Sequence, residues 1–115
     1  MKQETILVFG AHADDSILGA GGTIAKYAEE GKRIISVIFT SGEGSSPWLK
    51  GDVIKEERIQ EAIKIDQFLG CEKTLFLSIR DKYLFGGLTN KGLISLVNNK
   101  TLIEKVANII KKYEP

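Results

Sequence analysis

Three short apolar runs stand out along the chain, and each is bounded by glycine or polar residues. They cover residues 5–9, 34–40 and 74–77, and the first ends at Gly10. An unbroken apolar run of this length is typical of a strand that is buried on both faces of a parallel sheet. The pattern therefore predicts three buried strands.

Between these runs, apolar residues recur at the spacing of amphipathic helices. The first such segment, residues 23–30, ends before Gly31. The second begins at Asp52, a candidate N-cap, and ends before Gly70. Glycine is common just past the end of a helix, so each segment has a predicted C-terminal end as well as an apolar face.

A third helix is predicted near the end of the chain, from Thr101, which with Glu104 has the spacing of a capping box, to Lys112. Strands that alternate with helices favour right-handed crossovers and a mostly parallel sheet covered on both faces. We therefore expect an α/β fold, a Rossmann-like three-layer α/β/α sandwich, with residues 1–115 as a single domain. The alternation would next supply a strand, so we expect this to be the N-terminal part of a domain truncated after the third helix.

The composition of the chain argues against several classes of function. The chain has 115 residues, 43% hydrophobic and 27% charged, and a formal net charge of +1. This balance gives no electrostatic footprint for nucleic acid, and no apolar run reaches the roughly 18 residues of a membrane span. The single cysteine, Cys71, cannot form an internal disulfide and is predicted to be buried. Without a signal-peptide pattern, a cytoplasmic protein is expected.

The candidate chemistry lies directly after the first strand, where His12, the only histidine, is followed by Asp14 and Asp15. In open α/β sheets, sites gather at the carboxyl ends of the strands. One imidazole and one carboxylate suit a metal ion, and a second carboxylate suits a general base. A catalytic zinc usually takes three protein ligands, and no second histidine is present. The alternative to a metal site is a purely structural role, in which these residues form a hydrogen-bonded turn and the carboxylates cap the following helix.

The segment His12-Ala13-Asp14-Asp15, followed by a glycine-rich stretch at residues 19–22, resembles the zinc-dependent N-acetylglucosamine de-N-acetylases (PIG-L/LmbE-like). The likeness extends through residues 38–43, 58–62 and 77–81. It implies that His12 and Asp15 are zinc ligands and that Asp14 is the general base. It therefore implies a hydrolase that acts on an acetylated amino sugar or a related small amide.

Three further residues are candidates for binding the substrate: Arg58, Asp81 and Glu43. The resemblance supports the first two, and Glu43 follows the second predicted strand. For Arg58, an ion pair with a neighbouring glutamate on the helix surface is the alternative.

The chain departs from the family pattern in three ways. Ala13 replaces a proline, Ser16 replaces an acidic residue, and the segment that supplies the remaining zinc histidine is missing. A catalytically incomplete fragment or subunit, completed by a partner chain, is therefore the alternative to a deacetylase. Zinc is the expected cofactor, although these donors accept other divalent ions. A sheet with an unpaired edge also predicts homo-oligomers.

Overall fold

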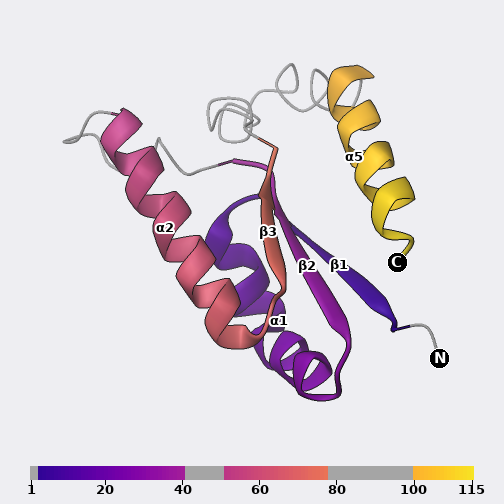
Figure 1. The fold of residues 1–115 in the computed structure, drawn as a ribbon. Helices are drawn as coiled ribbons and strands as arrows, with labels where there is room; N and C mark the ends of the chain where they lie inside the picture. Colours follow the sequence, from indigo (N-terminus) through magenta and orange to yellow (C-terminus); the bar gives the residue numbers. More distant parts are fainter. Residues whose placement is uncertain (1–2, 41–50, 78–99) are drawn as a thin grey trace.

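The computed structural model describes residues 3–40, 51–77 and 100–115. The elements follow in the order β1 (Thr5–Gly10), α1 (Ala13–Glu29), β2 (Arg33–Ile38), α2 (Gly51–Leu69), β3 (Lys73–Phe76) and α5 (Lys100–Tyr113) (Figure 1). The three strands form one parallel sheet in the order β1-β2-β3. The α/β class, the three strands and their parallel arrangement are thus confirmed.

The central strand β2 and the edge strand β1 differ in burial. In β2, Ile34, Ile35, Val37 and Ile38 are each at most 1% exposed. In β1, which lies at an edge of the described sheet, Phe9 is 40% exposed. The expectation of burial on both faces is therefore confirmed for β2 and wrong for β1. Association of chains through this edge stays a prediction.

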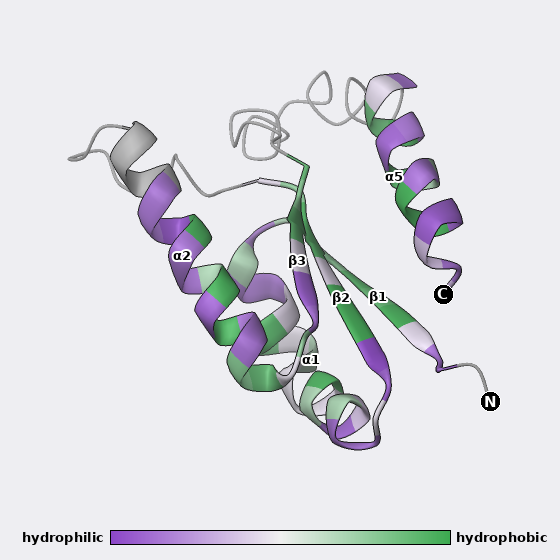
Figure 2. Cartoon of the chain, viewed as in Figure 1, coloured by the Kyte–Doolittle hydropathy of each residue, from purple (hydrophilic) through white to green (hydrophobic). Residues whose placement is uncertain are grey.

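Helices cover both faces of the sheet. On one face, Ile34 packs with Ile24 of α1 and with Cys71. On the other face, Ile35 packs with Tyr113 of α5. Because neighbouring side chains of a strand point to opposite faces, β2 contributes to the core on both sides of the sheet. Figure 2 shows that most of the β2 ribbon is hydrophobic. None of the helices in the described ranges is long and apolar enough to cross a membrane.

Helix α1 begins at Ala13, well before the predicted start at residue 23, so that prediction was wrong. Its interior glycines, each costing up to about 1 kcal/mol relative to alanine, disfavour a helix when the sequence is considered alone. The helix forms because its inner face, which includes Ser16 and Ile24, is buried. Packing of such a face outweighs local propensity.

The predicted starts of the second and third helices were also wrong. Asp52 lies inside α2, which begins at Gly51, and Thr101 lies inside α5, which begins at Lys100. The predicted C-terminal ends are confirmed. Gly31 has φ +84° and Gly70 has φ +96°, a backbone conformation that favours glycine. At Gly70 a Cβ atom would also lie 2.5 Å from the Cβ of Ala28. The second glycine therefore lets α2 approach α1.

Candidate functional site

The ends of β1 and β2 hold the segment that carries the histidine. The Phe39 N–H donates to the Gly10 carbonyl at 3.0 Å. The Thr40 N–H, in a residue that is 1% exposed, donates to the Ala11 carbonyl at 3.0 Å. These bonds extend the pairing of the two strands past their ends. They anchor His12 at the carboxyl edge of the sheet, where sites of open α/β sheets gather.

The start of α1 brings the imidazole and one carboxylate together. His12 is the N-cap, and its backbone N–H donates to Asp15 Oδ2 at 2.8 Å. The same oxygen lies 3.7 Å from His12 Nδ1. Their side chains are 26% and 51% exposed, while the Nε2 atom of the imidazole is shielded from solvent. The two predicted metal ligands thus lie next to each other.

Gly10 allows this close return of the chain. A Cβ atom at Gly10 would lie 3.0 Å from the His12 carbonyl oxygen and 3.5 Å from the Cβ of Asp15. The first distance is shorter than an ordinary van der Waals contact. A larger residue would therefore press on the segment that holds both predicted ligands.

Asp14 differs from its neighbour. It is exposed in the first turn of α1, and within residues 3–40, 51–77 and 100–115 no hydrogen bond or ion pair engages its carboxylate. Negative charge in a first helical turn is favoured by the helix dipole. The capping role considered in the sequence analysis is thus taken by Asp15, and the carboxylate of Asp14 is left for contact with water.

The donors fit zinc in kind, since zinc binds imidazole nitrogen and carboxylate oxygen. As predicted ligands, His12 and Asp15 would supply two of the three protein ligands of a usual catalytic site. The described part of the chain holds no group of three or more histidine, cysteine, aspartate or glutamate side chains placed for a metal ion. The other predicted site carboxylates, Glu43 and Asp81, lie outside the described residues.

Arg58 lies in the first half of α2. This half is nearer the carboxyl edge, because α2 ends beside the start of β3 (Figure 1). Its Nη1 atom is 3.2 Å from Glu61 Oε2, and the two side chains are 40% and 58% exposed. The ion pair named as the alternative is therefore present. The side chain of Arg58 is still accessible to solvent, and a role for it in substrate binding stays a prediction.

One buried acidic residue was not predicted from the sequence. Asp66 of α2 is 2% exposed and accepts a hydrogen bond from the Thr74 hydroxyl at 2.7 Å. The one feature of the sequence that could have predicted its burial is its position four residues after Ala62, on the apolar face of the helix. The predicted burial of Cys71 is confirmed, and burial, together with the charge of Asp66, raises the pKa of its thiol to about 11.

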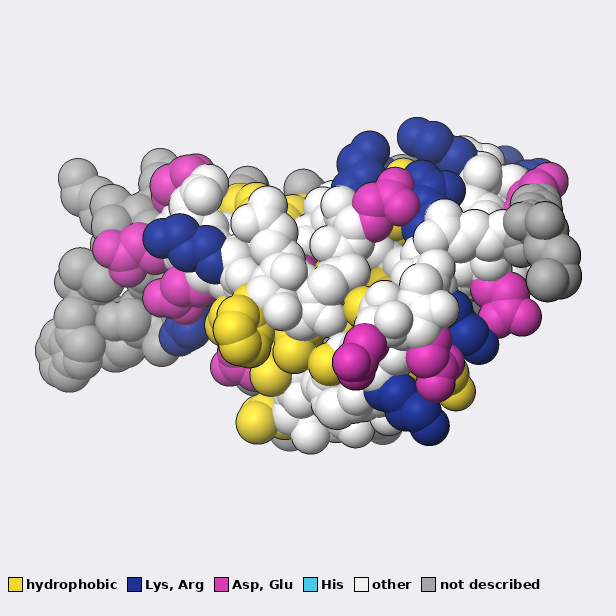
Figure 3. All heavy atoms as spheres, turned by 60° about the horizontal axis from the view of Figure 1, so that its bottom comes forward, with side chains coloured by type: hydrophobic (Ala, Val, Ile, Leu, Met, Phe, Trp, Pro, Cys, Tyr) yellow, Lys and Arg dark blue, Asp and Glu magenta, His cyan; other side chains and the backbone are white. Residues whose placement is uncertain are grey.

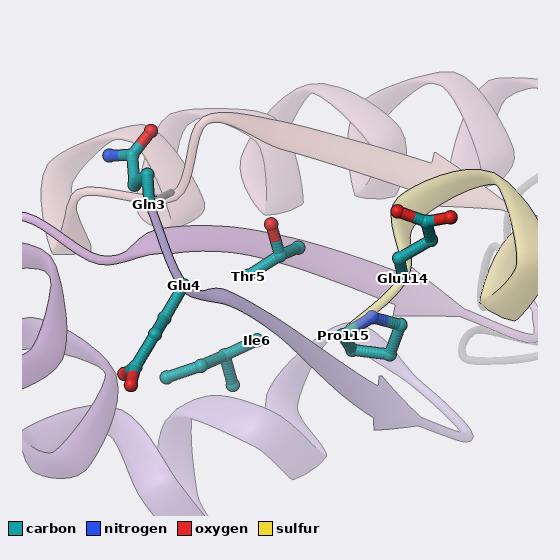
Figure 4. Close-up of a pocket in the computed structure, with 6 residues that line it drawn as sticks. All are labelled: Gln3, Glu4, Thr5, Ile6, Glu114 and Pro115. Carbon is teal, nitrogen blue, oxygen red and sulfur yellow. The ribbon is translucent and has the colours of Figure 1, made fainter. Parts of the chain in front are cut away.

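A pocket of about 440 Å³ lies at the opposite end of β1 from the histidine. Figure 4 shows its lining, which is Gln3, Glu4, Thr5, Ile6, Glu114 and Pro115. Lys32 forms a 2.8 Å ion pair with Glu4, and this hydrogen bond lowers the pKa of the Glu4 carboxyl. The pocket thus contains none of the predicted site residues.

The fold and the cluster after β1 define an α/β protein with a candidate site at the ends of parallel strands. The chain belongs to the PIG-L family, described as GlcNAc-PI de-N-acetylase, whose pattern matches residues 7–115. The resemblance seen in the sequence is therefore confirmed.

Its relatives include two kinds of enzyme. The chain is 36% identical over 80 residues to an uncharacterized deacetylase, YaiS, of Escherichia coli, covering 70% of this chain and 40% of that protein. It is 33% identical over 81 residues to 4-oxalmesaconate hydratase of Pseudomonas putida, covering 64% and 31%. The solved structure of N,N'-diacetylchitobiose deacetylase from Pyrococcus horikoshii matches with a TM-score of 0.65 and 31% identity, over 69% of this chain and 30% of that one. The chain thus spans 40% or less of each of these proteins.

Proposed function

We propose that the protein is a metal-dependent hydrolase that removes an acetyl group from an N-acetylglucosamine-type or related small amide. One observation carries the proposal: the start of α1 places His12 Nδ1 3.7 Å from Asp15 Oδ2, beside the exposed carboxylate of Asp14, in a chain of this family. The deacetylases among its relatives support this class of reaction.

Each residue has a role in this proposal. His12 and Asp15 hold zinc or another divalent ion, which when bound polarises the amide carbonyl. Asp14 accepts a proton from the attacking water and returns it to the leaving nitrogen. The water oxygen bonds to the carbonyl carbon, the C–N bond breaks, and the products are acetate and a free amine. Arg58 binds a polar group of the substrate through charge-assisted hydrogen bonds, and Glu43 and Asp81 bind its hydroxyls.

The alternative is a catalytically incomplete module that gains its remaining ligand from outside these 115 residues. Two protein ligands bind a metal ion more weakly than three, because each metal–ligand bond adds to the free energy of binding. For these residues alone we therefore expect weak zinc binding and little turnover. Activity is expected only where a third ligand is supplied.

The test is a zinc titration of the purified chain, combined with an assay for acetate released from N-acetylglucosamine. We expect weak binding of one zinc per chain that is lost in His12→Ala and kept in Glu29→Ala, an exposed acidic residue at the far end of the same helix. Zinc binding that is equal in His12→Ala and in the wild type would contradict the assigned site.

The hydratase relative provides a second candidate reaction, because a hydratase also uses water as its nucleophile. It adds water to a double bond instead of breaking an amide bond. A protein that binds zinc through His12 but hydrates 4-oxalmesaconate, and releases no acetate from N-acetyl substrates, would favour this second reaction.

A further inference from the structure

A buried carboxylate on α2 has no role in the chemistry proposed above. Asp66 is 2% exposed and accepts a hydrogen bond from Thr74 Oγ1 at 2.7 Å. Burial of a carboxylate is unfavourable unless hydrogen bonds replace the water that it loses. An apolar side chain of similar size could pack at such a position without that cost. The presence of Asp66 therefore needs a reason other than stability.

The bond lies at a constrained corner between α2 and β3. The backbone carbonyl of Asp66 accepts the Cys71 N–H at 2.8 Å, and Gly70 turns the chain with φ +96°. Thr74 pairs with Ser36 of the central strand. Because β2 is the most deeply buried strand, this pairing holds the backbone of Thr74 in place. Asp66 thus links α2 to β3 through its side chain and to the turn before β3 through its backbone carbonyl.

The same face of α2 leads from Asp66 to the candidate site. Asp66, Ala62 and Arg58 follow one another at intervals of four residues, so each is displaced by only about 40° around the helix. Ala62 is 1% exposed, whereas Arg58, at the border of this face, has a side chain that is 40% exposed. Rotation of the helix by about 20° would move a group roughly 7 Å from its axis by about 2 Å. The orientation of α2 therefore decides where the guanidinium group of Arg58 lies.

We propose that Asp66 and Thr74 are positioning residues: their buried hydrogen bond fixes the rotation of α2 and thereby places Arg58 at the carboxyl edge of the sheet. Apolar side chains alone allow small rotations at little cost, whereas a hydrogen bond requires a narrow distance and angle. A charge-assisted bond away from water is also stronger than an exposed one. As a statement about substrate binding, this inference rests on the proposed function.

The test follows the Arg58 side chain by its Nε–Hε signal in proton–nitrogen NMR of the full chain, assigned with Arg58→Lys. Thr74→Val removes the hydroxyl with little change of shape, and we expect it to shift the Arg58 signal. Thr74→Ser keeps the hydroxyl and should restore the wild-type position. Thr101→Val, at an exposed threonine of α5, is the matched control and should leave the signal in place.

A double variant keeps the test decisive if Thr74→Val does not fold. Asp66→Leu/Thr74→Val replaces both partners by apolar groups, a change that is often neutral for stability. We expect this protein to fold with a displaced Arg58 signal. An unmoved Arg58 signal in either folded variant would overturn the inference.

Substrate binding separates this inference from the proposed function. With zinc present, the wild type should bind N-acetylglucosamine more tightly than Thr74→Val, while the zinc affinity of the two proteins should be equal. If the sugar binds to neither protein, substrate binding by these residues alone is contradicted, and the Arg58 signal still decides the role of Asp66.

Discussion

The strands begin at one end of the sheet, its amino edge, and finish at the other, its carboxyl edge. These two ends use charged side chains in opposite ways. At the amino edge, Arg33 binds both oxygens of Glu72 at 2.7 and 2.8 Å, and its guanidinium carbon lies 5.2 Å from the centre of the Tyr113 ring. Figure 3 shows this end of the molecule, where side chains of both signs are interspersed. At the carboxyl edge, Asp15 contacts His12, and the carboxylate of Asp14 has no partner among the described residues.

This difference separates stabilising charges from charges available for chemistry. The hydrogen bond from Arg33 lowers the pKa of the Glu72 carboxyl, so that pair is already satisfied in the folded protein. A carboxylate without such a partner can accept a proton from water or contact a ligand. We therefore expect substitutions at the amino edge to change stability, and those at the carboxyl edge to change metal binding or turnover.

The largest expected effect is on turnover at the carboxyl edge. In the catalytically active protein, whether this chain alone or with a third ligand supplied, Asp14→Asn should lower the rate of acetate release by about 10²- to 10⁴-fold, because the general base is lost. Zinc affinity and thermal unfolding should be unchanged. Full activity in Asp14→Asn would remove Asp14 from the mechanism.

A large loss of stability is expected at the amino edge. Gly70→Ala forces a side chain into a left-handed conformation and places its Cβ 2.5 Å from that of Ala28. We expect the free energy of unfolding to fall by about 2–4 kcal/mol in urea denaturation. Gly31→Ala is the matched control, with positive φ but no atom within 4 Å, and should cost about 1–2 kcal/mol. Equal losses would show that α1 and α2 are not in close contact here.

A smaller, pH-dependent effect is expected for Arg33→Gln, which should lower the unfolding temperature at neutral pH. Because Arg33 lowers the pKa of Glu72 in the folded state, the stability from this pair is present above the ordinary carboxyl pKa of 4.5 and is lost as the pH falls through the lowered value. The difference from the wild type should therefore shrink below pH 4.5. Lys26→Gln, at an exposed lysine of α1, should show no such pH dependence.

The smallest effect is a gain of stability in the middle of α1, between the two edges. Gly22 is exposed in the interior of α1, and a Cβ there would meet no atom within 4 Å. Gly22→Ala should raise the free energy of unfolding by about 0.5–1 kcal/mol, because the unfolded chain becomes less flexible. Zinc affinity should stay the same. A loss of stability would indicate that this face of α1 is covered in the folded protein.

Local patterns predicted much of the fold. The apolar runs gave the three strands and their parallel arrangement, and Gly31 and Gly70 marked the helix ends, since positive φ is a property of single residues. The closeness of His12 and Asp15 in the sequence, directly after a strand, also indicated a cluster. The structure brings them together because His12 is the N-cap of α1 and Asp15 is its third residue. The starts of the helices were less predictable, since burial of Ser16 and Ile24 outweighs the glycines of α1.

The sequence by itself thus determined the class of fold, the family and the residues that follow β1. Only the tertiary structure decided that Phe9 is exposed at an edge, that Asp66 is buried and bonded to Thr74, and that Arg58 pairs with Glu61. The reason is physical. Strand character and turn conformation depend on neighbours in sequence, whereas burial and side-chain partners depend on which distant segments the sheet brings together.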